Sequence, residues 1–345
     1  MTAIVLEGRT GNPLRWFSAR LVSVALLVSA TLTAATAAVH AQSTNFGAGF
    51  LLQPVGARTV GHGEATAADT TLGTEALWWN PAGMARMRKR EFGVHHAQTF
   101  LANTDMLAFA YPSKALGTIA ASVLLVNYGD IEATDSTGNA IGLSTNRYYV
   151  LSAGYATPVG KHFSAGLTGK KILLRFICSG CLVSQPNRIG NAYALDLGAQ
   201  YILPLKAPIT IGASVRNLGE KLQAKDEAQA DPLPSIIQIG AQGQVPLAAL
   251  AKSMTTLDLR ADLLTSPAYS SPSLRVGADL SYKNQYTLRV GYKQVGQNDG
   301  VESGLTAGFG FKYNSVEFDV ARRFDASSSI GEATAPTYIS LRYVF

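Results

Sequence analysis

The chain ends on "YISLRYVF", residues 338–345, and this stretch alternates strictly between two kinds of side chain. Ile339, Leu341, Tyr343 and Phe345 share one face of an extended segment. A period of two is the spacing of a β-strand. The stretch therefore predicts a strand with one continuous apolar face that stops on an aromatic residue.

The same alternation recurs along most of the chain after residue 90. In "YTLRVGYK" (286–293), aromatic and aliphatic residues occupy one face, and Thr287, Arg289 and Lys293 occupy the other. Glycine, proline, asparagine and aspartate separate such segments, as turns between strands require. We count fourteen candidate strands: 91–99, 104–112, 117–127, 146–157, 162–176, 191–203, 208–217, 235–245, 254–264, 273–282, 285–294, 303–313, 315–324 and 337–345.

Two all-β folds produce such a pattern. In a soluble sandwich one face of each strand packs on a core and the other is solvated. An outer-membrane barrel instead has an even number of strands, short turns alternating with long loops, and aromatic residues at the strand ends. This chain shows those three features, with short connections such as 283–285 and 313–315 and long ones such as 128–145 and 218–234. The sequence favours the transmembrane β-barrel.

The composition agrees with this prediction. Of the 345 residues only 15% are charged, 47% are hydrophobic and 33 are glycine, whereas a soluble domain carries about 25% charge. The net charge is +6, without the dense basic face that a nucleic-acid partner requires. We therefore expect no nucleic acid among the partners.

The N-terminus has the pattern of an export signal. Arg9, Arg15 and Arg20 precede an uncharged run, 21–38, which leads to a small-x-small site at Ala41. We predict a cleaved signal peptide over residues 1–41 and a mature net charge of +4. An uncleaved membrane anchor is the alternative. The predicted location is the bacterial outer membrane, with membrane lipid as the first partner.

The stretch "LWWNPAGMARM" (77–87) precedes the first strand and has no alternation. A barrel of about fourteen strands is too wide for its own side chains to fill, since about eight strands already suffice for that. We expect residues 42–90 to form a hatch or plug inside the barrel of residues 91–345. The predicted hatch and ligand-pocket residues are Trp78, Trp79, Asn80, Pro81, Ala82, Gly83 and Met84.

Charged residues in the strands must face the lumen, because a charge on the lipid face would cost about 2–4 kcal/mol at the midplane. Both signs occur on neighbouring strands, which argues against a strongly ion-selective pore. The predicted lumen charges are Asp196, Asp258, Arg260, Asp262, Arg289, Glu317 and Asp319, together with Arg275, Asp279, Lys293, Arg323 and Arg342.

The only cysteines, Cys178 and Cys181, lie in a predicted external loop. A small structural disulfide is the leading interpretation for an exported protein. Free thiols are the next alternative, and a metal site is the last, because two ligands do not make one. No nucleophile-elbow, zinc-protease or phosphate-loop motif is present. We therefore expect no enzymatic activity, no metal and no cofactor.

The residues also resemble a known family. The segment "GARTVGHGEATAADTTLGTEALWWNPAGMARM" (56–87) resembles the hatch of the PorV/PorQ family, and "VRNLGEK" (215–221) and "LRVGYK" (288–293) resemble later parts of it. That family is similar to the FadL-type fatty acid transporters, which are fourteen-stranded barrels with an N-terminal hatch. One departure is Val60-Gly61-His62-Gly63, where the family often carries glycine-methionine-glycine-glycine.

The resemblance implies two alternative functions. PorV-like members act in type IX secretion, so secreted cargo proteins would be partners. FadL-like members are passive channels for hydrophobic compounds, so small apolar molecules would be the substrates. The terminal residues Tyr343 and Phe345 resemble, in addition, the C-terminal signal that the barrel-assembly machinery recognises. Cargo or substrate, any lateral opening and the oligomeric state are not specified by the sequence.

Overall fold

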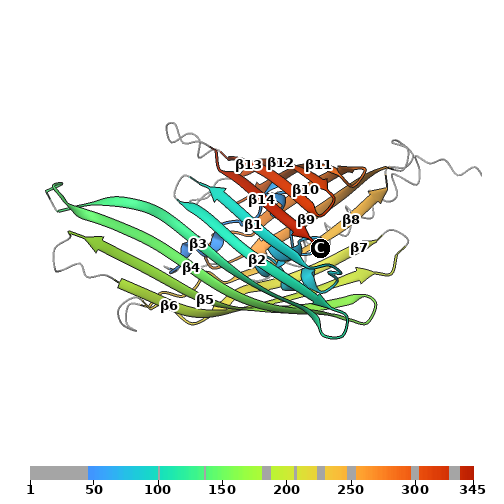
Figure 1. The fold of residues 1–345 in the computed structure, drawn as a ribbon, viewed down its shortest axis with the longest axis horizontal. Helices are drawn as coiled ribbons and strands as arrows, with labels where there is room; N and C mark the ends of the chain where they lie inside the picture. Colours follow the sequence, from blue (N-terminus) through green and yellow to red (C-terminus); the bar gives the residue numbers. More distant parts are fainter. Residues whose placement is uncertain are drawn as a thin grey trace, which may run out of the picture.

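The computed structural model describes residues 46–99, 102–135, 137–180, 188–205, 208–223, 230–246, 254–296, 303–325 and 335–345. In these ranges fourteen antiparallel strands form a closed barrel, in which each strand pairs with its neighbours in sequence and β14 closes on β1 (Figure 1). The predicted all-β barrel of fourteen strands is confirmed.

The strands have the following bounds: β1 (Glu91–Gln98), β2 (Asn103–Ser113), β3 (Gly117–Thr134), β4 (Ala140–Val159), β5 (Phe163–Ser179), β6 (Arg188–Leu203), β7 (Ile209–Gly219), β8 (Ile236–Pro246), β9 (Thr255–Thr265), β10 (Ser273–Tyr282), β11 (Tyr286–Gln294), β12 (Gly304–Tyr313), β13 (Val316–Asp325) and β14 (Thr337–Val344). The helical elements all precede β1: the 3₁₀-helix η1 (Gly49–Leu52), the α-helix α2 (Ala57–Gly61) and the 3₁₀-helices η2 (Gly73–Leu77) and η3 (Pro81–Met84).

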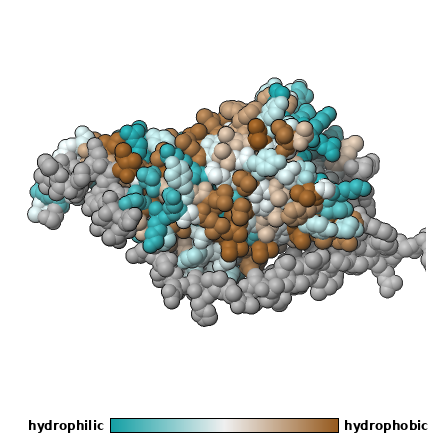
Figure 2. Space-filling view, turned by 90° about the horizontal axis from the view of Figure 1, so that it is seen from below, coloured by the Kyte–Doolittle hydropathy of each residue, from teal (hydrophilic) through white to brown (hydrophobic). Residues whose placement is uncertain are grey.

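The wall alternates between an apolar outer face and an inner face. In β2, for example, exposed and buried residues alternate from Asn103 to Tyr111. The outward side chains include Leu288 and Val290, which are 59% and 58% exposed. Figure 2 shows hydrophobic residues across the middle of one face, with hydrophilic residues toward both ends. The outer surface therefore carries an apolar band of the kind that lipid, rather than water, would cover.

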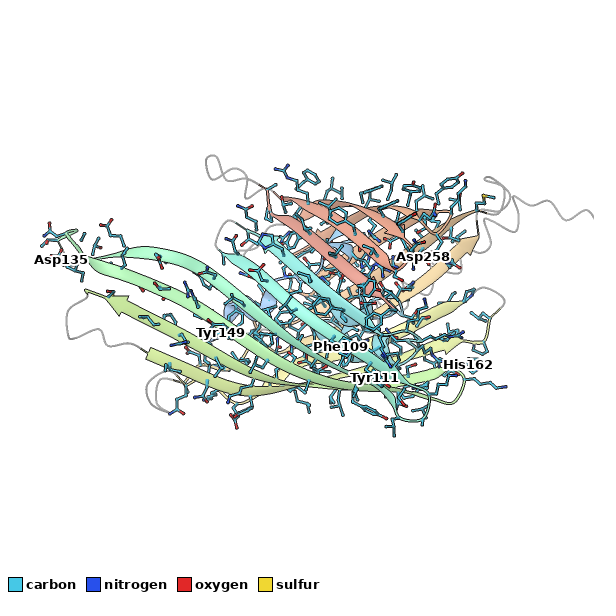
Figure 3. The ribbon with its side chains drawn as sticks, in the orientation of Figure 1. Phe109, Tyr111, Asp135, Tyr149, His162 and Asp258 are labelled. Carbon is cyan, nitrogen blue, oxygen red and sulfur yellow. The ribbon has the colours of Figure 1, made fainter. Side chains whose placement is uncertain are left out.

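The strands differ greatly in length. β3 to β6 have 16 to 20 residues, whereas β10 to β14 have 8 to 10. The long strands project at one end of the barrel, the left end in Figure 1. Figure 3 labels Asp135 at the tip of this projection and His162 in the turn between β4 and β5 at the opposite end.

The prediction of a long loop over residues 128–145 is wrong. β3 and β4 continue through most of this stretch and meet in a turn around Asp135, which accepts hydrogen bonds from the amides of Thr137 and Asn139, both at 2.9 Å. The pairing shifts register between Asn127 and Asp130. Both faces of the projecting strands are largely exposed, so no apolar and polar alternation marks them in the sequence.

No helix in the described ranges has the length and apolar character needed to cross a membrane. The helices are short pieces of the N-terminal segment, residues 46–90, which lies within the barrel. α2 packs against β11 to β14, η2 against β1 to β4, and η3 against β4 to β6. The segment therefore contacts most of the inner wall.

Glycines in the wall allow the segment to lie directly against the strands. At Gly212 of β7 an added Cβ would overlap the carbonyl oxygen of Ala67, and at Gly291 of β11 it would overlap the backbone of Gly63. Gly169 of β5 differs, because the nearest atom to an added Cβ there is 4.0 Å away. Glycine is thus required at the first two positions for close approach of two backbones, and not at the third.

This difference predicts opposite results for two matched substitutions. Gly212→Ala should lower the free energy of unfolding by about 1–3 kcal/mol, because overpacking displaces a buried backbone. Gly169→Ala should leave it nearly unchanged, although both glycines lie in strands of the same wall. Chemical denaturation of the two purified variants in detergent measures the effect. Equal stability of the variants would contradict the packing of Ala67 on β7.

Candidate functional site

The turn at residues 80–83 is organised by one asparagine. The Asn80 side chain caps η3 by accepting a hydrogen bond from the Ala82 amide at 3.1 Å. Its amide group donates to the carbonyl oxygens of Ala67 at 2.6 Å and Ala213 at 3.3 Å. Pro81 occupies the first helical position, where its fixed φ is favourable. The motif therefore joins three backbone segments, and Asn80, Pro81, Ala82, Gly83 and Met84 are all buried.

The two tryptophans are buried, their indole nitrogens donate hydrogen bonds, and a cationic side chain lies over a ring of each. Trp78 and Trp79 are 3% and 2% exposed, and their indole nitrogens donate to the carbonyl oxygens of Gln53 and Val55 at 3.2 and 2.9 Å. The Lys170 ammonium lies 4.7 Å from the centre of a Trp78 ring, and the Arg216 guanidinium lies 4.9 Å from that of Trp79. Both indoles are interior groups of the N-terminal segment, and a ligand-lining role for them stays a prediction.

One half of the lumen, lined by β8 to β14, is charged. Glu64 of the N-terminal segment pairs with Arg275, and its other carboxylate oxygen lies 3.5 Å from the Lys293 ammonium. Burial raises the pKa of Glu64, but the charges of Arg275 and Lys293 lower it more, to about 2. Glu64 is thus a carboxylate that fixes the segment to β10 and β11.

A second carboxylate holds the segment through its backbone. The Asp262 carboxylate of β9 accepts hydrogen bonds from the consecutive amides of Thr66 and Ala67, each at 2.7 Å. The same oxygen accepts from the Gln238 amide group at 2.6 Å. A carboxylate that binds two backbone donors satisfies amides that have no strand or helix partner. Gln200 completes this pattern by donating to the carbonyl oxygens of Ala67 and Asp69.

The remaining charges form a chain of ion pairs along the wall. Arg260 lies 3.4 Å from Asp69 and 2.9 Å from Asp279. Arg289 links Asp279 to Asp319 at 3.5 and 2.7 Å. Arg342 continues the chain from Asp319 and Glu317 to Glu91 on β1.

The structure places the predicted lumen charges as follows. Ten of the twelve are buried on the inner face, and Asp258 and Arg323 are partly buried. The Asp258 side chain lies 3.4 Å from that of Gln244. Asp196 is separate from the chain of pairs, because it lies at 2.6 Å from Lys170 on the apolar side. The buried ten are Asp196, Arg260, Asp262, Arg275, Asp279, Arg289, Lys293, Glu317, Asp319 and Arg342.

The other half of the lumen, lined by β2 to β6, is mostly apolar, although it also holds the Lys170–Asp196 ion pair and several buried serines and threonines. Side chains of the N-terminal segment and of these strands form one contiguous buried cluster, which includes Leu77, Trp79 and Met84 from the segment and Leu124 and Ile172 from the wall. The lumen is therefore divided lengthwise into a charged half that binds the segment by ion pairs and an apolar half that binds it by packing.

Four aromatic residues, which we call the aromatic cluster, cover the apolar half at the end where the strands project. Tyr148 of β4 is central, with ring centroids 5.2 Å from Phe50, 5.0 Å from Tyr128 and 5.4 Å from Phe176. Phe50 belongs to η1, and the other three face inward from neighbouring long strands. Tyr128, Tyr148 and Phe176 are only partly buried, so these inward-facing aromatic rings remain accessible.

The sequence did not single out this cluster. Phe50 lies in an irregular segment, and Tyr128 lies in the stretch predicted to be a loop. The signal that could have found it is the spacing of the two tyrosines from the short turns, because Tyr128 and Tyr148 each lie eleven residues from the ends of their strands, at Gly117 and Val159.

Two other predicted features lie outside the lumen. Cys178, near the end of β5, is disulfide-bonded, and its predicted partner Cys181 falls outside the described residues, so the pairing stays a prediction. The terminal residues Tyr343 and Phe345 face outward, with their rings stacked 5.1 Å apart. Phe345 exchanges two backbone hydrogen bonds with Arg90, at 2.9 and 3.0 Å.

Comparison with solved structures identifies barrels of the same fold. The chain aligns with the toluene transporter TbuX of Ralstonia pickettii with a TM-score of 0.56 and 13% identity, over 86% of this chain and 100% of that one. The toluene transporter TodX of Pseudomonas putida gives 0.56 and 12%, over 85% and 97%. The monoaromatic hydrocarbon channel CymD gives 0.56 and 13%, over 84% and 97%. At these identities the likeness concerns the fold.

No protein-family model matches the chain, and no curated protein matches it in sequence. The resemblance to PorV/PorQ that the hatch motif suggests therefore has no support in these comparisons. The fold belongs with the hydrocarbon transporters in its general architecture, which agrees with the FadL-like part of the resemblance.

Glu75 of η2 generates a pH prediction. It is fully buried, and neither carboxylate oxygen has a hydrogen-bond partner among the described residues. Burial raises its pKa from 4.5 to about 7, although Arg342 and Arg58 oppose the shift. The stability that the neutral carboxyl contributes is therefore full below pH 4.5 and is lost as the pH rises through about 7.

We expect Glu75→Gln to match the parent chain in thermal stability near pH 4.5 and to exceed it by several degrees at pH 8, because the amide cannot ionise. Calorimetry of both proteins across this range measures the difference. The exposed residue Glu132 provides the control, since Glu132→Gln should leave the pH profile unchanged. A constant difference between Glu75→Gln and the parent chain at all pH values would contradict the assignment.

Proposed function

We propose that the protein is an outer-membrane channel for the uptake of small hydrophobic compounds. The observation that carries the proposal is the aromatic cluster: partly exposed rings of Tyr128, Tyr148 and Phe176 face inward at one mouth of the barrel and lead onto a continuous apolar half of the lumen. Concave apolar surfaces with few polar groups are typical of sites for such ligands. The named functions of TbuX, TodX and CymD support the same class of substrate.

The outer membrane is the location that best fits the surface. The apolar band on the barrel matches the lipid-facing band of outer-membrane barrels, and the short turns lie together at one end, as periplasmic turns do. The export signal predicted for residues 1–41 supports this location. In this orientation the aromatic cluster faces the cell exterior.

The N-terminal segment acts as a plug in this proposal. Its polar contacts are concentrated on β8 to β14, whereas its contacts with β2 to β6 are mostly apolar. An apolar solute replaces packing contacts at little cost, but it cannot replace an ion pair in a buried site. We therefore place the route between the segment and the β2–β6 wall, with the charged half as the fixed side.

This arrangement favours transport over the secretion role that the PorV/PorQ resemblance implies. A secreted protein would need a binding surface outside the lumen. The aromatic cluster and the apolar half, on which the proposal rests, lie inside it. The buried charges serve to hold the segment, and no cofactor or reaction is part of the proposal.

The membrane placement predicts the effect of a charge in the band. Val290 lies near the middle of β11 and faces outward, so Val290→Arg should destabilise the folded protein in bilayers by about 2–4 kcal/mol. Leu116, in the turn between β2 and β3, is 70% exposed, and Leu116→Arg should have almost no effect. Unfolding titrations in phospholipid vesicles measure both. An equal and small effect of the two substitutions would contradict the placement.

The transport proposal is tested in vesicles that contain the purified protein. If the protein takes up hydrophobic compounds, uptake of labelled toluene or of labelled oleate should exceed that of protein-free vesicles. The double variant Tyr148→Ala with Phe176→Ala should reduce uptake several-fold. Tyr313→Ala, which removes an outward ring that is 62% exposed, is the matched control and should retain full uptake.

Binding provides a second measurement. After removal of residues 1–41, Trp78 and Trp79 are the only tryptophans, so their fluorescence reports on the apolar half of the lumen. A ligand that enters this half should change the emission of the parent chain and not that of the double variant. No uptake of either probe by a correctly folded parent protein would refute the proposal.

A further inference from the structure

The outer surface of the long strands carries positive charge where the lipid band ends. Arg147 of β4 and Arg175 of β5 are exposed, and the two residues are direct cross-strand partners. Side chains in such a pair have Cβ atoms about 4.5–5.5 Å apart, and like charges there are destabilising. Lys171 lies on the same outward face of β5, four residues from Arg175. These three residues form a basic cluster.

No acidic side chain of the described residues forms an ion pair with this cluster. Asp130, the nearest acidic residue along the outer face of β3, is opposite Thr145 and accepts a hydrogen bond from its hydroxyl at 2.6 Å. The Lys171 ammonium lies 5.7 Å from the centre of the Tyr193 ring on β6. The cluster therefore presents positive charge that no carboxylate pairs with, next to apolar side chains, and it is open to an external anion.

A hollow lies directly beside the cluster. Its volume is about 430 Å³, and its outward-facing lining comprises Leu151, Ala153, Gly169, Lys171 and Tyr193. Gly169 leaves the floor of the hollow open, because it has no side chain between its cross-strand partners, Ala153 of β4 and Leu195 of β6. The outward side of the hollow is mostly apolar, and its charged side chain is Lys171; Lys170 also borders the hollow, but its ammonium pairs with Asp196 inside the barrel.

The distance of these groups from the short-turn end, measured along the membrane normal, determines which part of the membrane they contact. Phe163 begins β5 at the short-turn end. With a strand tilted by about 40°, Lys171 lies roughly 20 Å and Arg175 roughly 30 Å above it along the membrane normal. The apolar band of such a barrel is about 25 Å tall, so the basic cluster spans the upper boundary of the band. Tyr149, labelled in Figure 3, lies on the same face of β4 between Arg147 and Leu151.

We propose that this surface binds a phosphorylated lipid of the outer leaflet, with its phosphate between Arg147, Arg175 and Lys171 and an acyl chain in the hollow over Gly169. Guanidinium groups bind phosphate through paired hydrogen bonds, and one phosphate removes the repulsion between the two arginines. The hollow below adds apolar contact for the chain. This site goes beyond the uptake function, and it rests only on the outer-membrane placement proposed above.

The test uses the purified full-length protein in detergent, with lipid A as the probe and native mass spectrometry as the readout. The parent chain should retain one lipid A molecule. The double variant Arg147→Gln with Arg175→Gln should bind lipid A with an affinity lower by about tenfold or more, because two charge-assisted contacts are lost. Gly169→Leu should weaken binding without a change of charge, since the new side chain fills the hollow.

The matched control is the double variant Lys114→Gln with Lys283→Gln, which removes two exposed charges from the short-turn end. It should bind lipid A as the parent chain does. Undiminished binding by the arginine double variant, or an equal loss in the lysine control, would overturn the proposal. Equally tight binding of phosphatidylglycerol or displacement of lipid A by millimolar inorganic phosphate would overturn the assignment to an outer-leaflet lipid.

Uptake measured on the same arginine variant separates this site from the proposed function. Toluene uptake should be unchanged, because the cluster faces away from the lumen. Loss of lipid binding with intact uptake in the arginine variant supports the lipid site. If the parent chain binds lipid A but shows no uptake, the channel function is refuted and the lipid site is not.

Discussion

The width of the barrel is the constraint on which the rest of the structure depends. Fourteen strands enclose more space than inward side chains can fill, and the N-terminal segment occupies that space. A segment with so little regular structure brings unpaired amides and carbonyls into the interior, and each must find a partner there. The wall meets this need with side chains such as Asp262 and Gln200, and it accommodates the backbone by glycines such as Gly212.

The two halves of the lumen solve the same problem in different ways. The ion pairs from Glu64 to Arg342 are directional and buried, so removing one partner leaves an uncompensated charge. The apolar half depends on packing, which tolerates exchange of one apolar group for another. In the proposed channel for hydrophobic solutes, the ion-paired half is the fixed side and the packed half is the exchangeable side.

The period of two in the sequence was sufficient to predict the strands and their number, because a barrel exposes one face to an apolar environment and so enforces the alternation. The inward direction of charges such as Arg289 and Asp319 followed from the cost of placing them in lipid. Their partners did not follow, since Arg289 reaches Asp319 thirty residues away through the register of three strands. The projecting hairpin of β3 and β4 was missed because neither of its faces is buried, so the sequence there does not alternate, and the aromatic cluster was missed with it. The tryptophans were conspicuous in the sequence, but the structure buries them in the interior of the segment.

The hydrogen bonds between the N-terminal segment and the wall join residues that are far apart in the sequence, which has a consequence for assembly. The segment is made first, yet Ala57 donates to Ser340 and Thr66 to Asp262, across 283 and 196 residues. Asp262 lies on β9 and Ser340 on the last strand, β14. Contacts of such sequence separation make folding slow, and the bond to Ser340 coincides with the pairing of β14 to β1 that closes the wall. The segment's backbone is therefore satisfied in stages as the wall forms, and its bond between Ala57 and Ser340 is made only when the barrel closes.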